Sequence, residues 1–95
     1  MIHATETLMW SDVGSHTAYQ AGKRPGGWVV SWLPRRVLDG RQAWLAMHLA
    51  DIYCARPEPG SAWWGSAREL ERELGVSPRV LRRVVTKARS MAGGV

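Results

Sequence analysis

Cysteine is almost absent from this 95-residue sequence, in which Cys54 is the single example. No disulfide can therefore form within the chain, which favours a reducing compartment. No apolar run approaches the roughly 20 residues that a membrane-spanning helix needs. The first six residues lack the basic and apolar regions of a signal peptide. We therefore expect a cytoplasmic protein with no membrane partner.

Acidic residues are also scarce: eight Asp and Glu stand against 13 Lys and Arg, for a net charge of +5 and a pI of about 10.4. Such a balance favours an anionic partner, with nucleic acid ahead of a membrane surface. Most of the cations are arginines, which suit phosphate and base recognition. A GC-rich genome explains the arginine excess equally well, and we favour that explanation.

Phenylalanine is missing altogether, and six tryptophans take its place. Apolar residues make up 45% of the chain, a fraction typical of a folded protein. A chain this short builds only a small core, so we expect indole rings to supply much of its buried area. Residues 1–95 are expected to form a single domain.

The recurring signatures of enzymes are absent too. The sequence has no glycine-rich phosphate loop and no nucleophile elbow, and its aspartates form no recognisable acid/base pair. The three histidines and Cys54 show no metal-ligand spacing. His48 is expected to be a core histidine rather than a ligand. We predict no metal, no cofactor and no enzymatic activity.

The N-terminal part, residues 1–38, is predicted to contain a β-hairpin. Residues 28–33 (WVVSWL) are β-branched or aromatic, and they follow a glycine-rich loop at 22–27. Residues 17–21 would form the other strand. Pro34 is expected to end the second strand, and residues 34–38 to form a short helical turn.

The remainder, residues 41–90, is predicted to be a three-helix core. Residues 41–55 lack Gly and Pro and are apolar almost all round, which indicates a central helix. Residues 62–64 are expected to be extended. The predicted fold class is therefore α+β, mostly α, with an N-terminal β-hairpin.

Residues 66–90 carry the signals of a helix-turn-helix. Ser66 and Glu69 have the spacing of a capping box, and the helix that they begin should run to Leu74. Gly75 suits a left-handed helix end. Ser77 is a good N-cap, and Pro78 suits the first turn of a second helix that should reach about residue 89. A turn of three residues requires the two helices to cross steeply.

The second helix of this motif is divided into two faces. Its apolar stripe comprises Val80, Leu81, Val84, Val85 and Ala88. The opposite stripe comprises Arg79, Arg82, Arg83, Thr86 and Lys87, four of which are cationic and none acidic. The major groove of DNA admits a helix of this width between walls of phosphate. The pattern indicates a DNA-recognition helix.

Residues 70–84 read LERELGVSPRVLRRV. This stretch resembles the helix-turn-helix of many bacterial and phage regulators, and the longer segment 41–89 that contains it resembles small winged-helix-like DNA-binding proteins of actinobacteria and their phages. The resemblance implies a phage or prophage-type transcriptional regulator, or a recombination or replication accessory factor, that binds double-stranded DNA with full or partial sequence specificity. A mainly structural component of a nucleoprotein assembly is also open.

The resemblance implies DNA contacts from the second helix and from the starts of both helices, and the basic loop at Lys23 and Arg24 is a separate candidate contact. The candidate residues are Ser77, Arg79, Arg82, Arg83, Thr86, Lys87, Ser66, Arg68, Lys23 and Arg24. Two features depart from the family pattern. Glu71 stands where the family has alanine, so we expect its carboxylate to tilt outward. Too few residues follow the second helix for a C-terminal wing.

Two further partners are considered. A unit this small covers few base pairs, so a homodimer on a two-fold site is expected. The rival function is a protein-interaction module on the same fold, such as a phage factor that binds and inhibits a host protein. Trp63 and Trp64 would carry that contact, because tryptophan is enriched at interface hot spots.

Overall fold

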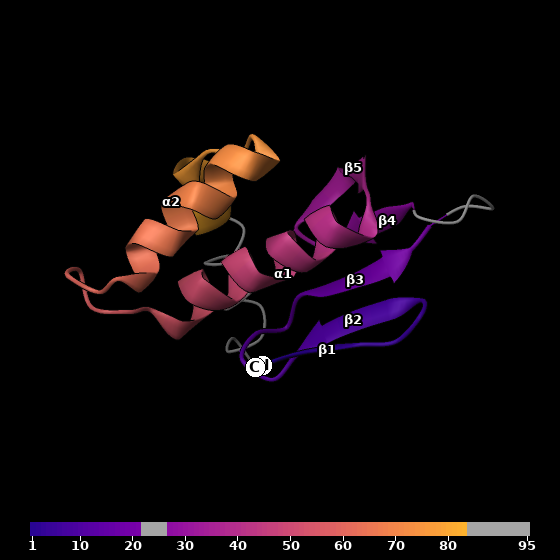
Figure 1. The fold of residues 1–95 in the computed structure, drawn as a ribbon, viewed down its shortest axis with the longest axis horizontal. Helices are drawn as coiled ribbons and strands as arrows, with labels where there is room; N and C mark the ends of the chain where they lie inside the picture. The colour runs from indigo at the N-terminus through magenta and orange to yellow at the C-terminus, as the bar shows by residue number, and fades with distance from the viewer. Residues whose placement is uncertain (22–26, 84–95) are drawn as a thin grey trace.

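The computed structural model describes residues 1–21 and 27–83, and it shows an α+β fold in which a sheet precedes the helices (Figure 1). The strands are β1 (Ile2–Ala4), β2 (Leu8–Ser11), β3 (Thr17–Gln20), β4 (Trp28–Val30) and β5 (Leu33–Leu38). The helices are α1 (Gly40–Ala55), α2 (Trp63–Leu74) and a third helix that begins at 78 and is described to 83. None of the described helices is both long and apolar enough to cross a membrane.

The five strands form one antiparallel sheet in the order of the chain. The predicted hairpin lies at its centre, where Ala18 pairs with Val30 and Gln20 pairs with Trp28. The sheet is larger than predicted, because β1 and β2 extend this hairpin on one side and β5 extends it on the other. A lone hairpin is only marginally stable in water, and the added strands create a face wide enough to support a helix.

The region around Pro34 was predicted wrongly. Residues 34–38 belong to β5 and not to a helical turn, and the chain reverses one step earlier, in a turn at Ser31 and Trp32. β5 is an edge strand, in which proline is tolerated because one side needs no ladder hydrogen bond. The strand pairing shifts in register between Trp28 and Val30.

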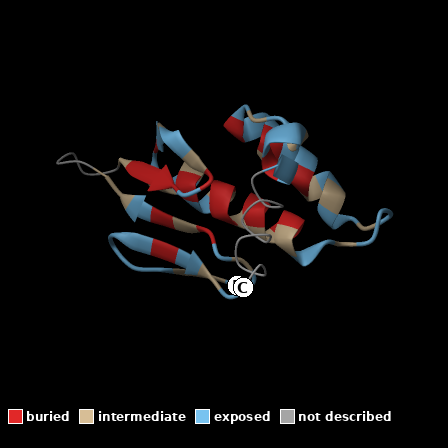
Figure 2. Cartoon of the chain, turned by 180° about the vertical axis from the view of Figure 1, so that it is seen from behind, coloured by how far each residue is buried: buried red, intermediate tan, exposed pale blue. Residues whose placement is uncertain are grey.

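Helix α1 covers one face of the sheet and is the centre of the core (Figures 1 and 2). It begins close to the predicted position, with Asp39 and Gln42 forming a capping box. Met47, Leu49 and Ala46 are almost fully buried, and the indole N–H of Trp32 donates to the Ala46 carbonyl at 3.1 Å. The sheet thus supports α1, and α1 supports α2 on its other side.

Tryptophan contributes less to the core than its abundance suggests. Trp28 and Trp32 are buried, whereas Trp10, Trp44 and Trp63 are exposed. Small and aliphatic side chains from α1 fill most of the remaining interior. Much of the aromatic surface of the protein is therefore open to solvent.

Helix α2 begins earlier than predicted. Residues 63 and 64 lie inside the helix and are not extended, and Ser66 is in its second turn. The predicted capping box at Ser66 is therefore wrong. The Oγ of Ser61 instead accepts a hydrogen bond from the Trp63 amide at 3.2 Å. The end of α2 at Leu74 agrees with the prediction.

Candidate nucleic-acid interface

The turn after α2 has the geometry that its sequence predicts. Gly75 adopts the left-handed conformation with φ of 68°, which glycine adopts without a Cβ penalty. The amide of Val76 donates to the Glu71 carbonyl at 3.1 Å, the pattern of a Schellman motif. Val76 also packs against the core. The direction of the chain after α2 is therefore set by local hydrogen bonds and by packing.

The third helix is held by one buried leucine. It begins at Pro78, and the amide of Val80 donates to the Ser77 carbonyl at 3.2 Å. Leu81 is fully buried in the core cluster. Because Leu81 faces inward, Arg79, Arg82 and Arg83 are left exposed on the other sides of the same helix.

These three arginines differ from Arg41 and Arg68, two other cations of the helical part. Arg41 pairs with Glu73 at 3.3 Å, and Arg68 pairs with Glu71 at 3.0 Å. Within residues 1–21 and 27–83, by contrast, none of the three arginines after Pro78 makes an ion pair. Their charge is thus not neutralised by a described carboxylate, and it is available to an anion in solvent.

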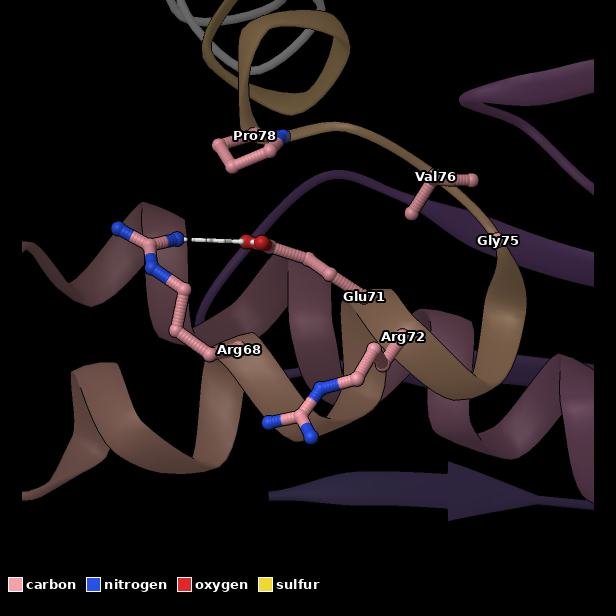
Figure 3. Close-up of a pocket in the computed structure, with 6 residues that line it drawn as sticks. All are labelled: Arg68, Glu71, Arg72, Gly75, Val76 and Pro78. Carbon is pink, nitrogen blue, oxygen red and sulfur yellow. Dashed lines mark hydrogen bonds and ion pairs between the residues drawn. The ribbon is translucent and has the colours of Figure 1, made fainter.

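Glu71 does not tilt outward, as we had expected, but is buried beneath the turn (Figure 3). Its Oε1 accepts a 2.5 Å hydrogen bond from the hydroxyl of Tyr53, and Arg68 donates to both carboxylate oxygens at 3.0 and 3.1 Å. Burial raises the pKa of the Tyr53 hydroxyl and the bond to Glu71 raises it further, so Tyr53 remains a protonated donor. A paired carboxylate can occupy a position where alanine was expected because its charge is compensated.

Arg68 therefore has a structural contact that the sequence analysis did not foresee. Its hydrogen bond to Tyr53, followed by the one to Glu71, raises the pKa of its guanidinium, which stays charged. The side chain remains 46% exposed, so one side of it still faces solvent. Ser66 lies within α2, where its amide bonds to the Ala62 carbonyl at 3.3 Å. It cannot offer a helix N-terminus to a phosphate.

Arg72 is a cation that the sequence analysis missed. A cleft of about 650 Å³ lies between α2 and the start of the third helix, lined by Arg68, Glu71, Arg72, Gly75, Val76 and Pro78 (Figure 3). Arg72 is exposed, and its spacing of four residues from Arg68 was the available signal. Arg72 adds a positive charge to the lining of this cleft, with its guanidinium directed away from Pro78 (Figure 3).

Four of the predicted DNA contacts, Lys23, Arg24, Thr86 and Lys87, lie outside the described residues. The described members of the set come together around the turn, with the exception of Ser66. Ser77 is exposed at the start of the third helix, beside the arginines that follow it.

The tryptophans proposed for a protein contact are not equivalent. Trp64 is half-buried, and its indole N–H donates to the carbonyls of Pro57 and Glu58 at 3.1 and 3.0 Å. Trp63 is exposed and lies beside His48, which stacks on Trp44. His48 is thus a half-buried member of an aromatic cluster and not a core histidine.

Comparison with known proteins adds no relative: no family model matches the sequence, and no curated protein or solved structure is similar to it.

Proposed function

We propose that this protein binds double-stranded DNA and inserts the helix that begins at Pro78 into the major groove. Helix α2, the turn at Gly75 and this helix together act as a helix-turn-helix in a winged-helix-like arrangement. The observation that carries the proposal is the exposure of Arg79, Arg82 and Arg83 without a described ion-pair partner, on a helix fixed to the core by Leu81.

The chemistry of the three arginines suits both parts of DNA recognition. A guanidinium donates two parallel hydrogen bonds to a phosphate or to the O6 and N7 of guanine. Contacts to phosphates supply affinity and position the protein, and contacts to bases supply specificity. Arg72, which lines the cleft between α2 and the third helix, is a further cation available to a phosphate. In the sequence, Thr86 and Lys87 continue the polar stripe of the third helix.

The biological role that follows is that of a small transcriptional regulator, or of a recombination or replication accessory factor, acting in the cytoplasm. This part of the proposal rests on the resemblance of residues 70–84 to actinobacterial and phage proteins. A homodimer would present two recognition helices to a two-fold site and would double the contacted length.

The test is fluorescence anisotropy with a labelled random-sequence duplex, measured from low to physiological salt. We expect the wild type to bind with a steep salt dependence, because phosphate contacts release counterions. Arg82→Ala should weaken binding and reduce the salt slope by about one. Arg35→Ala is the matched control: it removes the same charge from an exposed site on β5 and should leave the slope unchanged.

Equal losses in Arg82→Ala and Arg35→Ala would show that only net charge matters, and the recognition helix would then have no special role. Absence of binding by the wild type at low salt would reject the proposal.

The second candidate is a protein-interaction module, such as a phage factor that binds and inhibits a host protein. It is favoured by the exposure of Trp44 and Trp63, at 45% and 53%. A complex held by these rings should tolerate salt and survive Arg82→Ala, and it should be lost in Trp63→Ala.

A further inference from the structure

A second recess shares no lining residue with the cleft at the turn after α2. It has a volume of about 530 Å³, and it is formed by the N-terminal segment, the exposed side of α1 and the start of α2. Its lining includes Ile2 and Val13, the rings of Trp44, His48 and Trp63, and the carboxylate of Asp51. We call it the aromatic groove. Its volume lies within the range of about 300–1,000 Å³ that is usual for binding sites.

Three rings form the wall of the aromatic groove. His48 stacks on Trp44 with a centroid separation of 5.4 Å and an interplanar angle of 11°. Trp63 meets His48 edge-on at 6.1 Å and 70°. The rings of Trp44 and Trp63 thus lie on two walls at a steep angle, and both are about half exposed. They present indole surface to whatever enters the groove.

The electrostatics of the groove favour a cation. Indole faces attract cations through their quadrupole. Asp51 adds a carboxylate, and none of the described lining residues is a lysine or an arginine. Asp51 and Ala55 belong to the C-terminal part of α1, the negative end of the helix dipole, and the cation at the C-cap, Arg56, is not among the lining residues. Met1 also lines the groove, and its α-ammonium is a positive charge that helps to lower the pKa of the nearby Asp12 carboxyl.

A groove that selects a cation is unusual on a protein with a net charge of +5. A phosphate backbone requires positive charge, whereas the carboxylate of this groove is negative. The aromatic groove is therefore distinct from the proposed DNA-binding helix. Planar rings together with a carboxylate suit guanidinium best, because guanidinium stacks on aromatic faces and donates two parallel hydrogen bonds to a carboxylate. The volume of the groove is larger than that of one side chain, and Ile2 and Val13 offer apolar surface to the residues that flank the bound arginine in the partner.

We infer that the aromatic groove binds an arginine side chain of a partner protein, with the guanidinium against the exposed indole surface of Trp44 and Trp63 and paired with Asp51. This inference goes beyond the proposed DNA binding and does not depend on it. A partner could thereby be held on one side of the protein while the arginines after Pro78 contact DNA on another.

The first experiment uses the blocked tripeptide acetyl-Gly-Arg-Gly-amide as the probe, titrated into the ¹⁵N-labelled protein at pH 7.5. The indole N–H signals are followed by NMR and are assigned through single Trp→Phe variants. We expect the signals of Trp44 and Trp63 to shift, and that of Trp10 to stay in place. Trp10 is the matched control, because it is 38% exposed but lies on β2, outside the groove.

The same tripeptide with citrulline in place of arginine tests the charge, because citrulline has nearly the same shape and is neutral. We expect it to bind at least about three-fold more weakly, the size expected from losing an exposed cation–π contact. Asp51→Asn should weaken the arginine peptide by a similar factor. Arg82→Ala should leave its affinity unchanged, which separates this site from the DNA-binding helix.

Three results would overturn the inference. Equal shifts with the citrulline peptide would mean that the groove is merely apolar. No shift of Trp44 and Trp63 at about 20 mM peptide would mean that it does not bind guanidinium. Self-association in sedimentation experiments that is abolished by Trp44→Ala would identify the occupant as a second copy of the chain. If the protein fails to bind DNA in the anisotropy assay, the proposed DNA binding is rejected, but the results of the peptide titrations keep their meaning.

Discussion

The hydroxyl of Tyr53 on α1 donates a 2.5 Å hydrogen bond to the buried carboxylate of Glu71 on α2. Arg68 completes the arrangement from one turn earlier on α2. Only 5% of Glu71 is exposed, so its charge is stabilised by these two partners and hardly by water. The bond joins the central helix to the helix that precedes the proposed recognition helix, and it thereby sets the angle at which the turn leaves the core.

Tyr53→Phe should therefore destabilise the protein by about 1–3 kcal/mol, because it removes a hydrogen bond from a buried, charged acceptor. The measurement is urea unfolding followed by circular dichroism. Tyr19→Phe is the matched control: Tyr19 is 48% exposed on β3, and the change should fall within about 0.5 kcal/mol of the wild type. Equal stabilities of the two variants would contradict a structural role for the Tyr53–Glu71 bond.

Arg36, on β5, makes a second contact with α2, this time from the sheet. Its guanidinium donates to the carbonyl of Leu74, the last residue of α2, whose carbonyl has no partner within the helix. Arg36→Met keeps the aliphatic part of the side chain and should cost about 1–2 kcal/mol of stability. The neighbouring Arg35→Met changes an exposed residue and should cost little. Thermal unfolding of both variants checks this, and a larger loss in Arg35→Met would reject it.

These two contacts show what the sequence could not reveal. Tyr53 and Glu71 are 18 residues apart, and Arg36 and Leu74 are 38 apart. Nothing in the local pattern relates the members of either pair. Glu71 was expected to tilt outward because it stands where the resembling family has alanine, and its two partners, Tyr53 and Arg68, reverse that expectation. The role of Pro34 depended in the same way on β5 being the edge of the sheet.

Features with local causes were predicted well. The left-handed Gly75, the end of α2 at Leu74 and the start of the next helix at Pro78 all follow from the chemistry of single residues. The limits of α1 were also close, since the residues that cap it are its own neighbours. Even local signals compete, however. Ser66 suits a helix start, but α2 begins at Trp63 after the N-cap residue Ala62, and the Oγ of Ser61 accepts a hydrogen bond from the Trp63 amide. This start places two tryptophans in the first turn of α2. Of the candidate DNA contacts, the arginines after Pro78 were placed correctly on an exposed surface, while Arg68 and Ser66 were given roles that their structural contacts do not favour.

The glycines of α2 and of the turn provide a test with opposite signs. Gly75→Ala places a side chain at φ of 68° and should destabilise the protein by about 1–2 kcal/mol, although its Cβ would meet little but the Arg36 side chain at 4.0 Å. Gly65→Ala lies within α2, where an added Cβ meets nothing within 4 Å, and it should stabilise the helix by up to about 1 kcal/mol. Denaturant unfolding of both variants is the measurement. The same sign of change in both would show that backbone conformation does not control the turn.

The last prediction concerns acid. His16 is buried, its Nδ1 lies 3.3 Å from Ser31 Oγ, and its Nε2 has no hydrogen-bond partner among the described residues. Burial lowers the pKa of His16 below its ordinary 6.5, and the carboxylate of Asp51 only partly opposes this shift. As the pH falls through 6.5, the unfolded chain therefore takes up a proton at His16 while the folded protein does not. The free energy of unfolding must then decrease, with a slope from this group of at most about 1.4 kcal/mol per pH unit.

His16→Gln removes the titrating group, so its stability should depend less on pH than that of the wild type between pH 7.5 and 5.0. Urea unfolding at several pH values in this window measures both slopes. If His16→Gln loses stability toward acid as steeply as the wild type, the acid sensitivity has another origin. If its slope flattens, the buried imidazole of His16 accounts for the difference between the two slopes.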